Sequence, residues 1–98
     1  MANEQNTRKL EFELPADVAE GKYSNLSIIA HSKSEFIFDF ASMLPGMQKA
    51  KVHSRIILTP ENAKRLLLSL QENVGRYESN FGPIQTVGPK GPVGGGFA

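Results

Sequence analysis

The chain has 98 residues, a formal net charge of +1 and no cysteine. This length fits one domain, the lack of cysteine excludes a disulfide framework and a thiolate metal site, and two histidines without a carboxylate cluster give no reason to expect another metal or a cofactor. Because the N-terminus has no apolar leader and eighteen apolar residues never follow one another, we expect a cytoplasmic protein with no membrane segment.

Residues 1–8 are polar and predict a flexible tail, so we place the one folded domain at residues 9–82. From Lys9 to Leu14, apolar residues alternate with Glu11 and Glu13, as in a half-buried edge strand that ends at Pro15. Residues 15–25 then mix Pro, Asp and Gly with apolar residues. This mixture predicts a loop with at most one helical turn.

Two further strands are predicted at Leu26–His31 and Glu35–Ala41, joined by a short polar turn into an antiparallel hairpin. Phenylalanines occupy every second position of the later strand, and we expect a helix to cover this side. In the apolar loop that follows, Pro45 and Gly46 suit the centre of a type II turn. Its large side chains, those of Met43, Leu44 and Met47, predict an adaptable contact surface. The alternative is that Met43 and Leu44 close one end of the core, whereas Met47 is expected to be exposed.

A strand at Lys51–Leu58 leads directly into the one clear helix of the sequence. Thr59 can cap this helix, Pro60 suits its first position, and Gly82 predicts its end near Phe81. Apolar residues recur at helical spacing and form one stripe that should face a core: Ala63, Leu66, Leu67, Leu70, Val74, Tyr77 and Phe81.

Leu68 lies on the side of the helix opposite this stripe, with Gly75 beside it two turns further on. A large residue near a missing side chain suits contact with a second helix or a partner. The alternative is a surface leucine next to a tolerated glycine, because single exposed apolar residues are common.

These elements predict an α+β fold, a small antiparallel meander of three to four strands with one long C-terminal amphipathic helix packed on one face. Residues 83–98 are rich in Gly and Pro and predict a disordered tail. The helix, of about twenty residues and roughly 30 Å, can cover only one face of the sheet. The other face should carry isoleucines at its centre and polar residues around them: Ile29, Ile37 and Ile57, with His31, Asp39, His53 and Arg55.

An apolar centre within a charged rim is typical of an interface, so we expect a homo-oligomer in which two sheets pack about a twofold axis. A solvated face is the alternative. Residues 1–48 carry seven acidic and four basic residues, whereas residues 49–98 carry seven basic and three acidic ones. Basic residues of the second half predict a patch for an acidic protein surface or a nucleic acid, or simply a solvated face: Lys49, Lys51, Arg55, Lys64 and Arg65.

Signatures of catalysis are weak in this sequence. Neither a Gly-rich dinucleotide loop nor a phosphate-binding loop with Lys and Ser or Thr is present. Ser32 and Ser34 lie near His31, but the local turn offers no third group that would orient a base. We therefore expect no enzymatic activity and no catalytic residue.

Three motifs, SEFIFDF, SRIILTP and AKRLLLSLQEN, resemble a family of short bacterial proteins known as a domain of unknown function. The resemblance runs from about Leu14 to Ile84, while Gly75 and the Gly/Pro tail have no clear place in the family pattern. It implies no activity, but in one bacterial phylum the family's genes commonly neighbour that of the RNA polymerase β′ subunit. The order of three strands and a helix is also similar in outline to the export chaperone SecB, which is fold analogy only.

The leading hypothesis is a non-enzymatic accessory protein that binds RNA polymerase or another part of the transcription machinery. One alternative is a SecB-like oligomeric chaperone that binds unfolded polypeptides on apolar grooves. A second alternative is a nucleic-acid-binding dimer of strands and helices, although a net charge near zero gives it little electrostatic drive.

Overall fold

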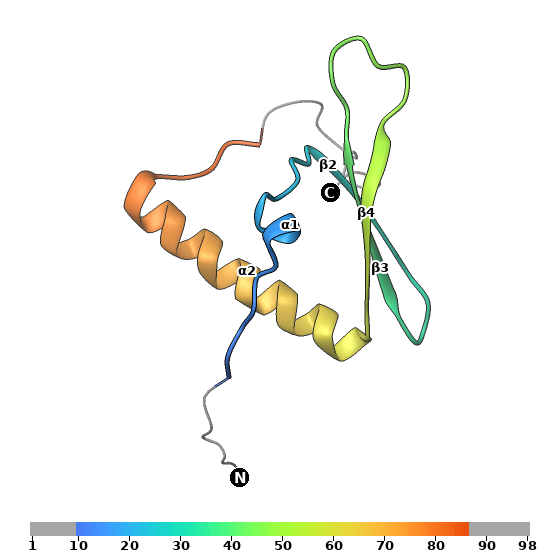
Figure 1. Cartoon of the computed structure of the whole chain (residues 1–98). Helices are drawn as coiled ribbons and strands as arrows, with labels where there is room; N and C mark the ends of the chain where they lie inside the picture. The colour runs from blue at the N-terminus through green and yellow to red at the C-terminus, as the bar shows by residue number, and fades with distance from the viewer. Residues whose placement is uncertain (1–9, 87–98) are drawn as a thin grey trace.

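A computed structural model of the chain describes residues 10–86, so the predicted tail at 1–8 and most of the tail at 83–98 lie outside the described residues. The elements in chain order are a helical turn, three strands and one long helix (Figure 1): α1 (Ala16–Ala19), β2 (Leu26–His31), β3 (Phe36–Ser42), β4 (Lys51–Leu58) and α2 (Pro60–Phe81). The strands form one antiparallel sheet in the order β2-β3-β4. The predicted α+β meander with a long C-terminal helix is confirmed.

The strand predicted at Lys9–Leu14 is wrong for residues 10–14, which form no strand, and Lys9 lies outside the described residues. These residues lead away from α1 rather than along the sheet (Figure 1). Leu10, Phe12 and Leu14 are all strongly exposed. Alternating apolar residues indicate that a segment has two different sides, but a strand also requires a neighbour that supplies backbone hydrogen bonds.

The predicted hairpin forms, with its second strand starting one residue later and ending one residue later than expected. The loop between β3 and β4 contains the predicted tight turn. The Met47 N–H donates to the Leu44 carbonyl at 3.0 Å, and Gly46 at its centre has φ of 89°. This positive φ is the conformation that a type II turn requires at its third position and that glycine adopts without strain.

Helix α2 begins and ends where the capping residues predict. Thr59 has an extended backbone, and its side chain accepts from the Asn62 N–H at 3.2 Å. Gly82, at φ 96°, donates its N–H to the Glu78 carbonyl at 2.9 Å. Two ion pairs, Glu61–Arg65 and Glu72–Arg76, lie on the exposed side of the helix, and each joins residues that are one turn apart.

Register places the side chains of β2 and β4 on the two faces of the sheet. Phe38 lies opposite Ile29 on β2 and Ile56 on β4, so these residues share a face, which we call the aromatic face. The prediction that Ile29 belongs with Ile37 on the other face is therefore wrong. The pairing puts Ile28 there instead, because the hairpin turn sets the register by one residue and one residue moves a side chain to the opposite face.

Helix α2 lies on the same side of the sheet as α1 and runs away from the sheet after leaving the end of β4 (Figure 1). Its apolar stripe is consequently covered only near its start, at Ala63, while Leu70, Tyr77 and Phe81 are exposed. The buried apolar residues of the described part are Ala41, at 1% exposure, and Ala63, at 9%. The single chain thus has the predicted layers but very little core.

Candidate functional site

The sheet face turned away from α2 carries a cluster of apolar residues that the register brings together. Ile37 lies directly opposite Ile57 on β4 and Ala30 on β2. Ile28, two residues before Ala30 on β2, lies on the same face of the sheet. Ile28 and Ile57 are exposed and Ile37 is half-buried. We call Ile28, Ile37 and Ile57 the isoleucine face. The structure brings Ile37 and Ile57 together as predicted, with Ile28 in the place predicted for Ile29.

An ion pair lies beside the isoleucine face. Asp39 and Arg55 are cross-strand partners, and the guanidinium donates from Nε to Oδ1 at 2.7 Å and from Nη2 to Oδ2 at 2.9 Å. This two-bond geometry holds both side chains in place. The hydrogen bonds from Arg55 hold the pKa of the Asp39 carboxyl below its ordinary value of 3.8, and the same bonds raise the pKa of Arg55.

The lowered pKa of Asp39 predicts a loss of stability in acid. Because the folded pKa is below the unfolded one, the pair's contribution is fully present above the unfolded pKa of 3.8 and is lost as pH falls through the folded pKa. In thermal melts, wild-type chain should lose more stability than Arg55→Gln between about pH 5 and pH 2. An NMR titration should return the Asp39 pKa to near 3.8 in Arg55→Gln. Identical Asp39 titration curves in the two proteins would contradict this assignment.

A bulge in the β3–β4 pairing removes His53 from the predicted rim. Phe40 pairs with Ser54 and Ala41 pairs with Val52, which leaves His53 as the extra residue. Its Nε2 lies 2.9 Å from the Tyr23 carbonyl, and its Nδ1 lies 2.8 Å from the Ser54 hydroxyl. A carbonyl only accepts, so the Nε2 N–H of His53 donates to Tyr23.

His53 thus contacts a serine hydroxyl, that of Ser54. Near His31, by contrast, the Ser32 and Ser34 hydroxyls bond to one another, and the His31 ring stacks on Phe36. Tyr23, the partner of the ring's other nitrogen, also accepts from the Ser42 hydroxyl at 2.8 Å. These contacts fasten the loop after α1 to the sheet. We interpret these contacts as structural and not catalytic. The neutral Tyr23 carbonyl would stabilise a histidine cation less than the carboxylate of a catalytic triad does.

An apolar groove separates α2 from the aromatic face. It has a volume of about 410 Å³, and its sides are formed by the sheet and by the first half of the helix: Ile29, Phe36, Phe38, Ala63, Leu66 and Leu70. Sequence reasoning placed the helix directly on the phenylalanines. The groove was missed because periodicity indicates which side of a helix is apolar, whereas the angle at which the helix leaves the sheet depends on tertiary contacts.

The remaining predicted site residues fall into two groups at opposite ends of β4. The loop residues Met43 and Leu44 are exposed, Met47 is half-buried, and Lys49 and Lys51 lie at the same end. Lys64 and Arg65 lie one turn into α2, beyond the other end of the strand. Eight residues of strand span about 25 Å, so the structure does not gather the four basic residues into one patch. Arg65 also pairs with Glu61 at 2.6 Å.

The comparison with known families gives one result. A family model described as "Protein of unknown function (DUF3467)" matches residues 1–86 of this chain. The chain belongs to the DUF3467 family. No curated protein and no solved structure shows significant similarity to it.

Within residues 10–86, no group of three or more His, Asp or Glu side chains is arranged to hold a metal ion. In the same range, the structure has no helix that is both long and apolar enough to cross a membrane.

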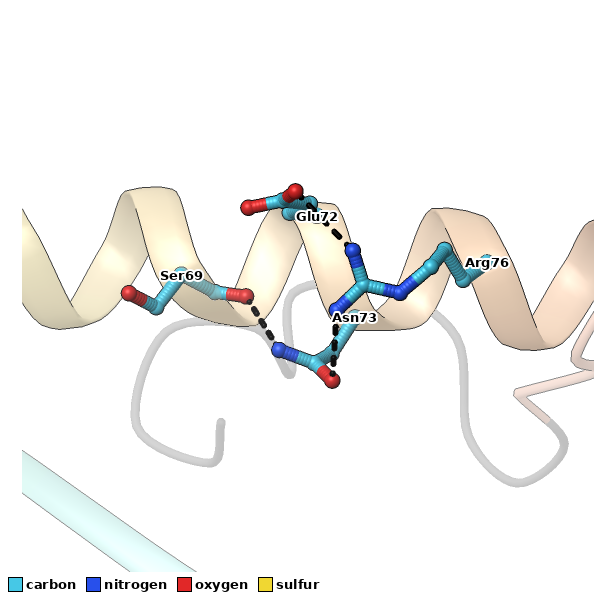
Figure 2. Close-up of polar contacts among 4 residues, drawn as sticks. All are labelled: Ser69, Glu72, Asn73 and Arg76. Carbon is cyan, nitrogen blue, oxygen red and sulfur yellow. Dashed lines mark hydrogen bonds and ion pairs between the residues drawn. The ribbon is translucent and has the colours of Figure 1, made fainter.

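Leu68 of the DUF3467 domain is exposed on the charged side of α2, one turn from both Arg65 and Glu72. The second of the ion pairs belongs to a chain of polar contacts in which Arg76 also donates to Asn73, and Asn73 to the Ser69 carbonyl (Figure 2). Leu68 remains 52% exposed beside this polar network. A Cβ added at Gly75 would meet nothing within 4 Å.

Replacement of Gly75 by alanine should stabilise the isolated DUF3467 domain. Alanine is favoured over glycine within a helix by about 1 kcal/mol, and at Gly75 it fits without contact. We expect a melting temperature roughly 4–8 °C higher. Ala63→Gly, at the covered end of the same helix, should lower it. A melting temperature of Gly75→Ala below that of the wild type at high protein concentration, but not at low concentration, would show that another chain packs against this position.

Proposed function

We propose that the protein is a non-enzymatic interaction module that forms a homo-oligomer and binds a larger protein. One observation carries this proposal: the described chain buries two alanines as its apolar core, while isoleucines on both faces of the sheet and leucines of α2 remain exposed. Full burial of one large apolar side chain contributes about 1.5–3 kcal/mol, and a folded domain is stable by only about 5–15 kcal/mol in total. Covering these surfaces with another polypeptide would therefore dominate the stability of the fold.

The favoured partner is RNA polymerase or another component of the transcription machinery. Support comes from the gene neighbourhood implied by the family resemblance. The isoleucine face offers an apolar centre with an ion pair at its rim, and Met43, Leu44, Lys49 and Lys51 offer a second contact at one end of β4. Such an apolar centre with a polar rim is the usual anatomy of a protein interface.

Co-purification tests this partner. A tagged chain expressed at its native level should bring down polymerase subunits at low and at moderate salt. The control is the same chain with Ile37→Asp and Ile57→Asp, which should recover none. Recovery of the wild-type chain free of polymerase subunits at both salt concentrations would contradict the proposal.

A SecB-like chaperone is the second candidate function, and the apolar groove favours it. The groove is lined mainly by aliphatic and aromatic side chains, among them Phe38 of the sheet and the exposed Leu66 of α2. An unfolded segment with large apolar residues would fit such a surface. Suppression of the aggregation of a thermally unfolded test protein would support this function, and no effect at stoichiometric excess would remove it.

Direct nucleic-acid binding is the weakest of the three functions. The basic residues lie at two ends of β4, and both Arg55 and Arg65 already pair with carboxylates. Phosphate binding by such a surface would weaken steeply with salt. Fluorescence anisotropy with a labelled duplex at about 50 and 200 mM salt distinguishes this case, because binding that does not change with salt excludes it.

A further inference from the structure

The outer edge of β4 is the feature of this fold that most requires a cover. In the order β2-β3-β4, β4 is an edge strand, and among the described residues its outer side pairs with no other strand. It has eight residues, contains no proline and carries two exposed isoleucines just before its last residue, Ile56 at 49% and Ile57 at 56% exposure. The unpaired backbone groups of a long edge strand recruit a further strand unless the edge is blocked.

The chain also contains one segment with the pattern of a strand and no strand to pair with. Leu10, Phe12 and Leu14 alternate with Glu11 and Glu13, and Phe12 is 86% exposed. Pro15, with φ of −60° and ψ of 148°, continues the segment in an extended direction. Because a proline also restricts the residue before it to extended conformations, Leu14 at the end of the segment is held close to the backbone geometry of a strand.

The two surfaces complement one another when the apolar side of the segment lies on the aromatic face. Phe12 would then lie beside Ile56, at the edge where α2 begins. Glu11 and Glu13 would lie on the isoleucine face beside Arg55, whose side chain is 61% exposed. The guanidinium uses two of its five N–H donors on Asp39, so it retains donors for a second carboxylate.

The segment does not reach this edge within its own chain. The loop after α1 is held over the sheet by the contacts of the Tyr23 carbonyl with His53 and Ser42, and residues 10–14 continue away from the sheet on the far side of α1 (Figure 1). A return to β4 of the same chain would require reversal at the rigid Pro15. A second copy can receive the segment without such a reversal.

We propose that residues 10–14 of one copy add as a fourth strand to the outer edge of β4 in a second copy, and that the exchange is reciprocal. The proposal rests on the homo-oligomer of the proposed function and specifies how its subunits join. Reciprocal addition uses the same two surfaces of each chain, as a closed dimer with twofold symmetry requires.

Photo-crosslinking from position 12 tests this contact without assuming a strand register. A chain with benzoylphenylalanine in place of Phe12 is mixed with an isotopically heavy wild-type copy, irradiated, digested and analysed by mass spectrometry. We expect crosslinks between light and heavy chains at residues 54–58. Crosslinks within one chain, crosslinks to any other element, or no crosslinks would overturn the exchange.

Serine substitutions give an independent test. Replacing Leu10, Phe12 and Leu14 with serine should weaken the dimer roughly 100-fold or more, because it removes three apolar side chains from the contact. The control Val18→Ser, also exposed but on α1, should leave the dimer intact. A serine variant that remains a dimer overturns the strand exchange but leaves the proposed oligomer standing, whereas a monomeric wild-type chain overturns both.

Discussion

Ala41→Leu is expected to be markedly less stable than the wild-type chain. Ala41 is 1% exposed and lies between Leu26 and Val52 at the bulge of the sheet. Its carbonyl accepts from the Asn25 N–H and lies 2.9 Å from the Ser24 hydroxyl. A larger side chain there overfills the closely packed space around the Ala41 side chain at a cost of about 1–3 kcal/mol, which is a large share of the stability of a small domain.

Urea unfolding followed by circular dichroism measures this effect. The midpoint for Ala41→Leu should fall markedly. The matched control is Val52→Leu, the same replacement on an exposed cross-strand neighbour, which should move the midpoint little. Equal midpoints for the two variants would show that the bulge is less tightly packed than the structure indicates.

Ile57→Asp is expected to weaken binding of the protein partner strongly while leaving the fold intact. Ile57 is 56% exposed and lies directly opposite Ile37 at the centre of the isoleucine face. A carboxylate at the centre of an apolar interface loses its hydration, and loss of a central interface residue costs about 2 kcal/mol or more. This corresponds to a roughly 30-fold or larger rise in Kd.

Fluorescence anisotropy with a labelled chain and purified RNA polymerase gives the Kd of each variant. Ile84→Asp, on a similarly exposed isoleucine after α2, is the control and should bind as the wild type does. Circular dichroism of Ile57→Asp excludes unfolding as the cause of any loss, and light scattering of the same variant excludes loss of the oligomer. An unchanged Kd for Ile57→Asp would place the contact elsewhere on the domain.

The sequence was most informative where a local interaction decides the structure. Thr59, Pro60 and Gly82 predict both ends of α2, because capping depends on residues within one turn. The turn at Pro45 and Gly46 was predictable for the same reason, since a positive φ at the third position favours glycine.

Register and packing were less predictable, because they depend on residues far apart in the chain. Ile29 was assigned to the wrong face since either parity of β2 gives an apolar alternation, and only the pairing with Phe38 decides between them. The bulge at His53 likewise shifts the pairing of the first residues of β4, so that Ala41 lies opposite Val52. The groove under α2 depends on the direction of the helix, which apolar periodicity leaves open.

The mass of the purified chain in solution, measured by light scattering coupled to size exclusion over a range of concentrations, tests the central claim most directly. The claim is that a second polypeptide covers the apolar surfaces that one chain leaves open. We expect a mass of at least twice the 10.7 kDa of one chain. A stable, folded species of 10.7 kDa at every concentration would contradict it.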